Sequence, residues 1–322
     1  MARDRAPILT DELLVGLIST ISIFLVKNLI DAVSPFFSYS KRGVDISDVP
    51  PSFDKVDREK FKKVVPSVEV KDLASVIKFL RDDKRLKRTK IVLLGWSEGT
   101  IIASMVAEDK KNAVSALFLA GYVHENMFDV IKWQYSGASS MIMLRRAFDK
   151  DADGNITKEE YESYDPAAVS MRTKRLQNVK FDQLDIKKDD LLNAKDFGLL
   201  AEPGYKLVLE KIKANDEDWI WKNYFRVSIG WLNEHLQLEA NKTRLLRLKL
   251  PIFIFHGEDD ASCDVNGVYD LKEQFSRLKK NNLRTFVFKE HNHDLNFLNW
   301  AEGKKMPEGI KEIFRMSEDL NK

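Results

Sequence analysis

Apolar runs and amphipathic stretches alternate through the first part of the chain. Apolar side chains recur at helical spacing over residues 67–82, which predicts a helix with one buried face. Residues 90–94 (KIVLL) form a short apolar run, typical of a buried parallel strand. Residues 100–108 return to helical spacing, and residues 113–120 form a second apolar run. This order of elements predicts a parallel α/β sheet.

The same alternation resumes near the C-terminus. Residues 251–255 (PIFIF) and 285–288 (TFVF) have the composition of two more buried strands. Residues 268–278 lie between them and have the spacing of a crossover helix. We therefore expect all four strands to belong to one sheet.

Residues 123–248 differ from the two parts that flank them. They hold four of the six tryptophans and long charged helical patterns, and the pattern predicts no strand there. We therefore expect a discontinuous α/β core, residues 1–122 and 249–322, with an inserted helical cap, residues 123–248, here called the lobe.

An apolar segment near the N-terminus, residues 13–26, contains 14 residues without a charge. A transmembrane helix needs about 20 such residues. A signal peptide would have small residues after the apolar segment, but Lys27 follows it, and Asp11 and Glu12 precede it. We favour a buried core segment in a cytoplasmic protein. The alternative is a protein exported or membrane-anchored through residues 13–26.

Composition narrows the class of protein. The chain has 52 basic and 50 acidic residues, a formal net charge of +2, whereas nucleic-acid-binding domains are usually strongly basic. We therefore expect no nucleic-acid partner. The single cysteine, Cys263, excludes an internal disulfide, and we assign it no role in a site.

A G-x-S-x-G motif, Gly95 to Gly99, joins the predicted strand to the predicted helix that follows. Such a sharp turn holds the serine in a strained backbone, which only small flanking residues permit, and exposes its hydroxyl above the sheet. Ser97 is therefore the candidate nucleophile, and the backbone N–H of Glu98 is the candidate oxyanion donor. The alternative is a tight turn with an inert serine.

A serine nucleophile needs a base that a carboxylate orients. The strand at 251–255 runs into acidic residues 258–260, and the strand at 285–288 runs into His291 and His293. Ligands of open α/β sheets bind at the carboxyl ends of the strands. An acid and a base therefore follow the serine in the order Ser, acid, His, and each lies at a strand end.

Four segments carry a resemblance to a known family: YSKRG (residues 39–43), GWSEGT (95–100), PIFIFHGEDD (251–260) and HNHDLN (291–296). They resemble the α/β-hydrolase superfamily, in particular its serine aminopeptidase and esterase-like branch. The resemblance implies an α/β-hydrolase sheet with helices on both faces. It also implies that Asp260 is the acid, rather than Asp259 or Glu258, and that His293 is the base, rather than His291.

Residues 149–160 (DKDADGNITKEE) resemble the twelve-residue EF-hand calcium loop. Calcium takes six to eight oxygen ligands, and this spacing supplies them from five residues: Asp149, Asp151, Asp153, Asn155 through its backbone carbonyl, and Glu160. A solvated acidic turn is the alternative. EF-hands usually come in pairs, so we expect a structural partner without calcium at residues 181–192, with Ile186 beside Ile156.

These observations predict a serine hydrolase that cleaves ester or peptide bonds of a small-molecule or peptide substrate through Ser97, His293 and Asp260. Ca²⁺ in the lobe is its predicted cofactor. The alternative is a catalytically inactive protein of the same fold that acts as a calcium-binding or regulatory module. This alternative is supported by the absence of a glycine-rich turn early in the chain, which in the family supplies the other oxyanion N–H. Gly16 is the only glycine before Gly43.

Overall fold

The computed structural model describes residues 40–44, 56–84, 90–301, 303 and 305–321. The N-terminal segment at residues 13–26, with its alternatives of core segment and anchor, lies outside the described residues. Among the described residues, the helices are all too short or too polar to cross a bilayer.

A four-stranded parallel sheet forms the centre of the molecule, as the sequence predicted. Its strands lie in the order β1 (Val92–Trp96), β2 (Ala116–Ala120), β5 (Ile252–Gly257) and β6 (Leu283–Phe288). All residues of β2 and β5 are buried, because these two strands lie inside the sheet and both sheet faces are covered. The order places β5 directly beside β2, although the whole lobe lies between them in the sequence.

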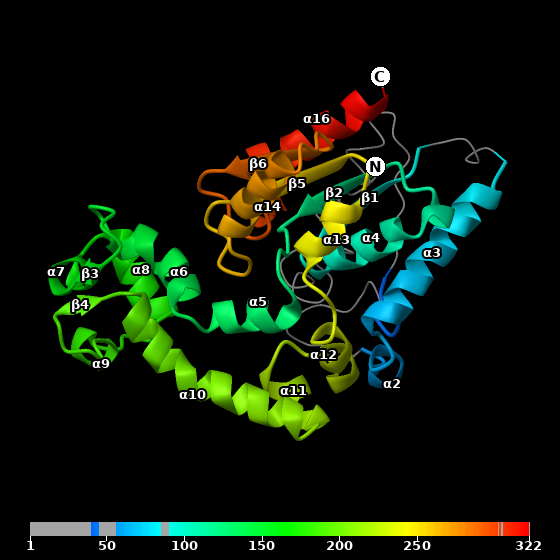
Figure 1. Cartoon of the computed structure of the whole chain (residues 1–322). Helices are drawn as coiled ribbons and strands as arrows, with labels where there is room; N and C mark the ends of the chain where they lie inside the picture. Colours follow the sequence, from blue (N-terminus) through cyan, green and yellow to red (C-terminus); the bar gives the residue numbers. More distant parts are fainter. Residues whose placement is uncertain (1–39, 45–55, 85–89, 302, 304, 322) are drawn as a thin grey trace, which may run out of the picture.

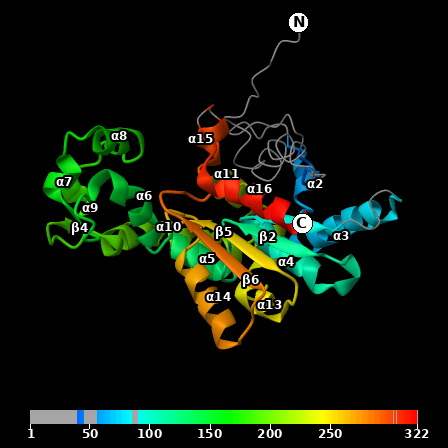
Figure 2. The ribbon, with the colours of Figure 1, turned by 90° about the horizontal axis from the view of Figure 1, so that it is seen from above.

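Alternate residues of the strands supply two hydrophobic clusters, one on each face of the sheet. One cluster joins Phe118, Phe253 and Phe255 to α15 (Phe297–Ala301) and α16 (Glu308–Asn321). The other joins the remaining strand residues to four helices: α3 (Pro66–Asp82), α4 (Glu98–Glu108), α13 (Asn241–Arg247) and α14 (Asn266–Arg277). Figure 2 shows α16 on one side of the sheet and α13 and α14 on the other. The sheet therefore has helices on both faces.

The lobe is helical, and most of it lies beyond one end of the sheet, as Figure 1 shows. Its helices are α5 (Met127–Gln134), α6 (Ala138–Phe148), α7 (Lys158–Glu162), α8 (Pro166–Lys174), α9 (Phe181–Leu184), α10 (Ala194–Lys213), α11 (Glu217–Asn223), α12 (Ile229–His235) and also α13, which packs on the sheet. It also holds two short strands that the apolar pattern did not predict, β3 (Ile156–Thr157) and β4 (Leu191–Leu192), which pair antiparallel. Each has two residues, too few for a visible alternation of apolar and polar positions.

The far part of the lobe has its own hydrophobic core, separate from the two clusters on the sheet. Leu144 and Phe148 of α6 pack there against Ile156 and Tyr161, and the rings of Phe148 and Tyr161 stack with centroids 5.0 Å apart. A further cluster, which includes Ile101 of α4 and several residues of α5, α10 and α12, joins the rest of the lobe to the core.

Two other short helices complete the described chain, α2 (Arg58–Phe61) and the 3₁₀ helix η2 (Lys110–Asn112).

Candidate active site

Ser97 occupies a strained turn between β1 and α4. Its backbone has φ 53° and ψ −122°, a conformation that costs free energy for any residue with a side chain. Its N–H donates to the carbonyl of Ala120 at 2.9 Å, which fixes the turn against β2. A Cβ at Gly95 would lie 2.3 Å from the carbonyl oxygen of Gly99, so the turn requires glycine there. Glu98 is the first residue of α4, and its N–H therefore has no partner within the helix.

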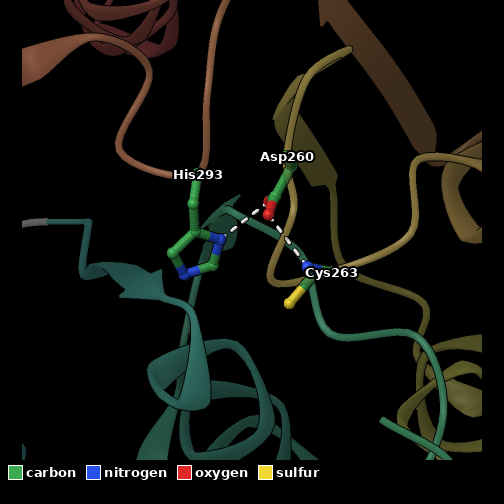
Figure 3. A group of neighbouring side chains, drawn as sticks. All are labelled: Asp260, Cys263 and His293. Atoms are coloured by element: carbon green, nitrogen blue, oxygen red, sulfur yellow. Dashed lines mark hydrogen bonds and ion pairs between the residues drawn. The ribbon is translucent and has the colours of Figure 1, made fainter. Parts of the chain in front are cut away.

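Asp260 and His293 form a hydrogen-bonded pair, which Figure 3 shows in detail. Asp260 is fully buried in the turn after β5. One of its carboxylate oxygens accepts hydrogen bonds from the N–H groups of Ser262 and Cys263, both at 2.8 Å. The other lies 2.7 Å from His293 Nδ1. Because an ionised carboxylate only accepts, Nδ1 carries the proton, and Nε2 is left to accept one.

Two contacts place His293 beside the serine turn. The indole Nε1 of Trp96, the residue before Ser97, donates to the carbonyl of His293 at 3.1 Å. Gly121, which follows Ala120 at the end of β2, is so close that a Cβ there would lie 2.8 Å from His293 Cε1. The three residues predicted as nucleophile, acid and base therefore lie at the carboxyl ends of β1, β5 and β6.

Burial and charge act in opposite directions on the Asp260–His293 pair. Burial by itself lowers the pKa of His293, but the adjacent Asp260 carboxylate raises that pKa well above its ordinary value of 6.5. Burial by itself raises the pKa of Asp260, but the charge and hydrogen bond of His293 lower it below the ordinary value. The pair thus favours an ionised acid beside an imidazole that binds a proton readily.

The neighbouring candidates for acid and base have other partners. His291 Nδ1 donates to the carbonyl of Lys289 at 2.7 Å, so no carboxylate orients it. The Asp259 carboxylate forms ion pairs with Arg145 and Arg146 of α6. Neither residue therefore has the kind of partner that Asp260 and His293 have in each other.

Two residues outside the predicted site, His256 and Cys263, lie against this pair. His256 is fully buried in β5; its Nδ1 accepts from the N–H of Tyr122 at 3.0 Å, and its Nε2 donates to the carbonyl of Cys263 at 3.1 Å. Cys263 Sγ, a carboxylate oxygen of Asp260 and a ring nitrogen of His293 lie within 4.8 Å of one another. Burial raises the pKa of the Cys263 thiol, so it stays protonated at neutral pH. No spacing in the sequence indicates these contacts.

The side chain of Glu98 is held by three donors from two parts of the chain, residue 41 and α12. Its carboxylate accepts from Lys41 Nζ at 2.6 Å, Trp231 Nε1 at 2.5 Å and His235 Nε2 at 2.8 Å. Although burial opposes ionisation, Lys41 and His235 hold the pKa of Glu98 well below its usual range. Burial and the charge of Glu98 raise the pKa of Glu69, the other partner of Lys41, to about 8. The residue after Ser97 is thus tied to α12 of the lobe.

In the lobe, the predicted calcium ligands lie on one exposed loop. Carboxylate oxygens of Asp149, Asp151 and Asp153 lie within 4.8 Å of one another. Gly154 has φ +86°, a left-handed conformation that favours glycine. Asn155, whose backbone carbonyl is the next predicted ligand, directly precedes β3. Oxygen atoms that converge in this way suit a hard cation such as Ca²⁺.

The last predicted ligand, Glu160, closes this loop. Its carboxylate accepts from the N–H of Lys150 at 2.9 Å and from the N–H of Thr157 at 2.8 Å. The first and last thirds of the loop are therefore tied together through one side chain.

The partner loop is not where the sequence predicted it. Ile156 pairs with Leu192 in the β3–β4 ladder, whereas Ile186 is 44% exposed. The predicted partner of Ile156 is therefore wrong by six positions, and the loop that corresponds to the first one spans residues 185–196. The alignment failed because both residues are apolar, whereas only Leu192 is buried.

The second loop repeats the hydrogen bonds of the first. Its first carboxylate, Asp185, accepts from the N–H groups of Asp189 and Asp190 at 3.3 and 3.0 Å. The carboxylate of Asp149 accepts in the same way from Asp153 and Gly154, both at 3.1 Å. The last carboxylates also correspond: Asp196 accepts from Lys187 and Asn193, as Glu160 does from Lys150 and Thr157.

The third position of the two loops differs in charge. The third position holds Asp151 in the first loop and Lys187 in the second. The Lys187 ammonium forms an ion pair with Asp189, and this contact, together with the charges of Asp196 and Asp185, raises its pKa. The second loop therefore has a cation of its own among its carboxylates.

Comparisons with known proteins agree with this architecture. A family model described as the alpha/beta hydrolase fold matches residues 19–299. No curated protein matches the chain significantly. Among solved structures, a monoacylglycerol lipase of Paleococcus ferrophilus is 15% identical and has a TM-score of 0.36; the match covers 80% of this chain and 75% of that chain.

Two other solved structures cover more of the chain. One, from work on carboxylesterases of Nitrososphaera gargenis, is 12% identical with a TM-score of 0.44, and covers 98% of this chain and 88% of that chain. The alpha/beta hydrolase GrgF of Penicillium sp. sh18 is 13% identical with a TM-score of 0.44, and covers 94% and 84% respectively. Since these TM-scores are low, the family of this chain is shown by the match to the family model alone.

Proposed function

Since this chain belongs to the α/β-hydrolase fold family, we propose that it is a serine hydrolase that cleaves ester or amide bonds of small molecules or peptides. One observation carries the proposal: a buried Asp260–His293 pair lies beside a serine that a strained strand–helix turn presents. An inert turn would not need a strained serine, and a structural histidine would not need a buried carboxylate on Nδ1.

In the proposed reaction, His293 Nε2 takes the proton of the Ser97 hydroxyl as its oxygen attacks the carbonyl carbon. Asp260 keeps the imidazole in the required tautomer and stabilises the imidazolium. The N–H of Glu98 donates to the oxyanion of the tetrahedral intermediate. His293 then protonates the leaving alcohol or amine, and a water molecule, activated by the same imidazole, releases the acid and regenerates Ser97.

The direct test is labelling by a fluorophosphonate probe together with turnover of p-nitrophenyl esters. Ser97→Ala is expected to abolish labelling and to lower kcat about 10⁴- to 10⁶-fold, because triad residues act as a unit. Ser276→Ala removes an exposed serine of α14 and serves as the matched control. His293→Ala should match Ser97→Ala, and His291→Ala should be mild.

The opposite results decide against the proposal. Labelling that persists in Ser97→Ala would assign the nucleophile to another residue. A wild-type protein with neither labelling nor turnover would favour the second candidate, an inactive calcium-binding module. That candidate draws on the sequence, which has no glycine-rich turn before Gly43 to supply the second oxyanion donor.

We also propose that the loop 149–160 binds one Ca²⁺ through Asp149, Asp151, Asp153, Asn155 and Glu160. The convergence of three carboxylates supports it, because such groups repel one another unless a cation lies between them. Calorimetric titration with Ca²⁺ tests it, and the absence of any binding heat would refute it.

A further inference from the structure

The turn that carries Asp260, residues 258–262, is bound from the side of the lobe. Four side chains of α5 and α6 contact it. Gln134 donates to the carbonyl of Ser262 at 2.9 Å and Ser139 to the carbonyl of Ala261 at 2.6 Å, and Arg145 and Arg146 form ion pairs with the carboxylate of Asp259. No other turn at the carboxyl ends of the described strands has so many recorded side-chain contacts with these two helices. The lobe therefore helps to set the position of this turn.

Asp259 connects the helix α6 of the lobe to the segment that carries His293. Its side chain is 11% exposed, whereas those of Arg145 and Arg146 are 40% and 46% exposed. A charge that is mostly withdrawn from water is costly unless it is paired, and two guanidinium groups pair with this carboxylate. The N–H of Asp259 donates to the carbonyl of His291 at 2.9 Å. One residue thus contacts α6 through its side chain and the histidine segment through its backbone.

We propose that Asp259 is a positioning residue, through which Arg145 and Arg146 of α6 hold the Asp260 carboxylate against His293. The inference rests on the proposed function for its kinetic consequences. Asp259 touches neither substrate nor the reacting atoms. Its role is to fix the backbone of the turn, so that the hydrogen bond between Asp260 and His293 keeps its length and direction.

The test compares wild type with Asp259→Asn and with the double variant Arg145→Gln/Arg146→Gln. Asp259→Asn keeps the shape of the side chain, the double variant replaces both guanidinium groups with shorter neutral amides, and both changes remove the ion pairs. We expect kcat for a p-nitrophenyl ester to fall about 10- to 100-fold, since a small misplacement of catalytic groups has effects of this size. KM should not change, because the substrate keeps its contacts. Asp218→Asn, which removes an exposed aspartate–arginine pair between α11 and α2, is the control and should keep the wild-type kcat.

A second measurement does not depend on turnover. The pKa of the His293 imidazole, followed by NMR and assigned with His293→Ala, should fall toward its ordinary value in Asp259→Asn, because the Asp260 charge moves away. The titratable groups that face this imidazole are Asp260, Cys263, His256 and Asp294, and none of them is altered in the variant.

An unchanged His293 pKa in a folded Asp259→Asn protein would overturn the inference. So would an unchanged kcat in an active enzyme, or a decrease in kcat that only matches a loss of folded protein in a thermal melt. Failure of the proposed function is recognised separately, because it leaves the wild type without probe labelling, while the NMR titration still decides on Asp259.

Discussion

Replacing Gly121 with alanine should displace the proposed base, His293, without changing the chemical groups of its side chain. Gly121 has φ +53°, and a Cβ there would lie 2.8 Å from Cε1 and 3.0 Å from Nδ1 of His293. Ordinary contacts begin near 3.4 Å, so the ring must retreat by about 0.6 Å. Because Nδ1 is bound to the buried Asp260, this retreat strains the acid–base hydrogen bond itself.

Two effects add to the expected size of the change. A left-handed backbone costs a residue with a Cβ about 1 kcal/mol, and an added methyl group in a packed site costs about 1–3 kcal/mol. The free energy of unfolding should therefore fall by about 2–4 kcal/mol. Displacement of the imidazole by a fraction of an ångström should lower kcat about 10- to 100-fold.

The assay measures kcat for a p-nitrophenyl ester and urea unfolding of the same samples. Gly303→Ala is the matched control, since Gly303 has φ +82° and no described atom beyond its chain neighbours within 4 Å of a Cβ. It carries the backbone strain without the contact, and should keep the wild-type kcat. Equal kcat in Gly121→Ala and Gly303→Ala would refute the argument that His293 occupies this place.

Three further predictions concern charge. Asp260→Asn should lower the pKa of His293, because the carboxylate raises it. Since the imidazole must lose its proton to act as a base, the acid limb of the pH profile of kcat/KM should move to lower pH. The value of kcat itself should fall about 10⁴-fold. Glu160→Gln should remove the stabilisation that Ca²⁺ gives the wild type, about 2.7 kcal/mol at 100 times the dissociation constant, measured by thermal melts in Ca²⁺ and in EGTA. Lys187→Asp should raise the calorimetric stoichiometry from one Ca²⁺ to two, because the ammonium no longer occupies the second loop; an unchanged value would refute that account of Lys187.

The apolar pattern predicted which segments form the sheet, but not where the strands end. Residues 90–94 were expected as the first strand, whereas β1 spans Val92–Trp96. The ladder continues through Gly95 and Trp96 because their backbones pair with Leu119 and Ala120, whatever their side chains prefer. Strand ends depend on the neighbouring strand, which a single segment of sequence does not reveal.

The candidate site, too, could be predicted from the sequence only in part. The turn at Ser97 could be predicted because its glycines and serine are neighbours in the sequence. Asp260 and His293 could be chosen over Asp259 and His291 only through the family resemblance. The contact of Gly121 with His293 links residues far apart in the sequence, and no local pattern indicates it.

The second loop of the lobe shows why an apolar residue alone does not fix a register. Ile186 and Leu192 are both suitable partners for Ile156 by composition. The hydrogen bonds of Asp185 and Asp196 place Leu192 at the pairing position. A search for carboxylates at the first and last positions of a twelve-residue loop would therefore have found it, whereas the apolar pattern did not.

The two chemistries that the sequence indicated separately meet on α6. Arg145 and Arg146 contact the turn of the proposed acid, and Asp149, the first carboxylate of the calcium loop, is the residue that ends the helix. A negative charge at a helix C-terminus is unfavourable, whereas positive charges there are favourable. A cation bound by Asp149 would remove the unfavourable part and hold the last turn of α6, the turn that carries both arginines. The proposed calcium loop and the turn of Asp260 thus both contact the same helical turn, and calcium binding, if the proposal holds, would reach Asp260 through it.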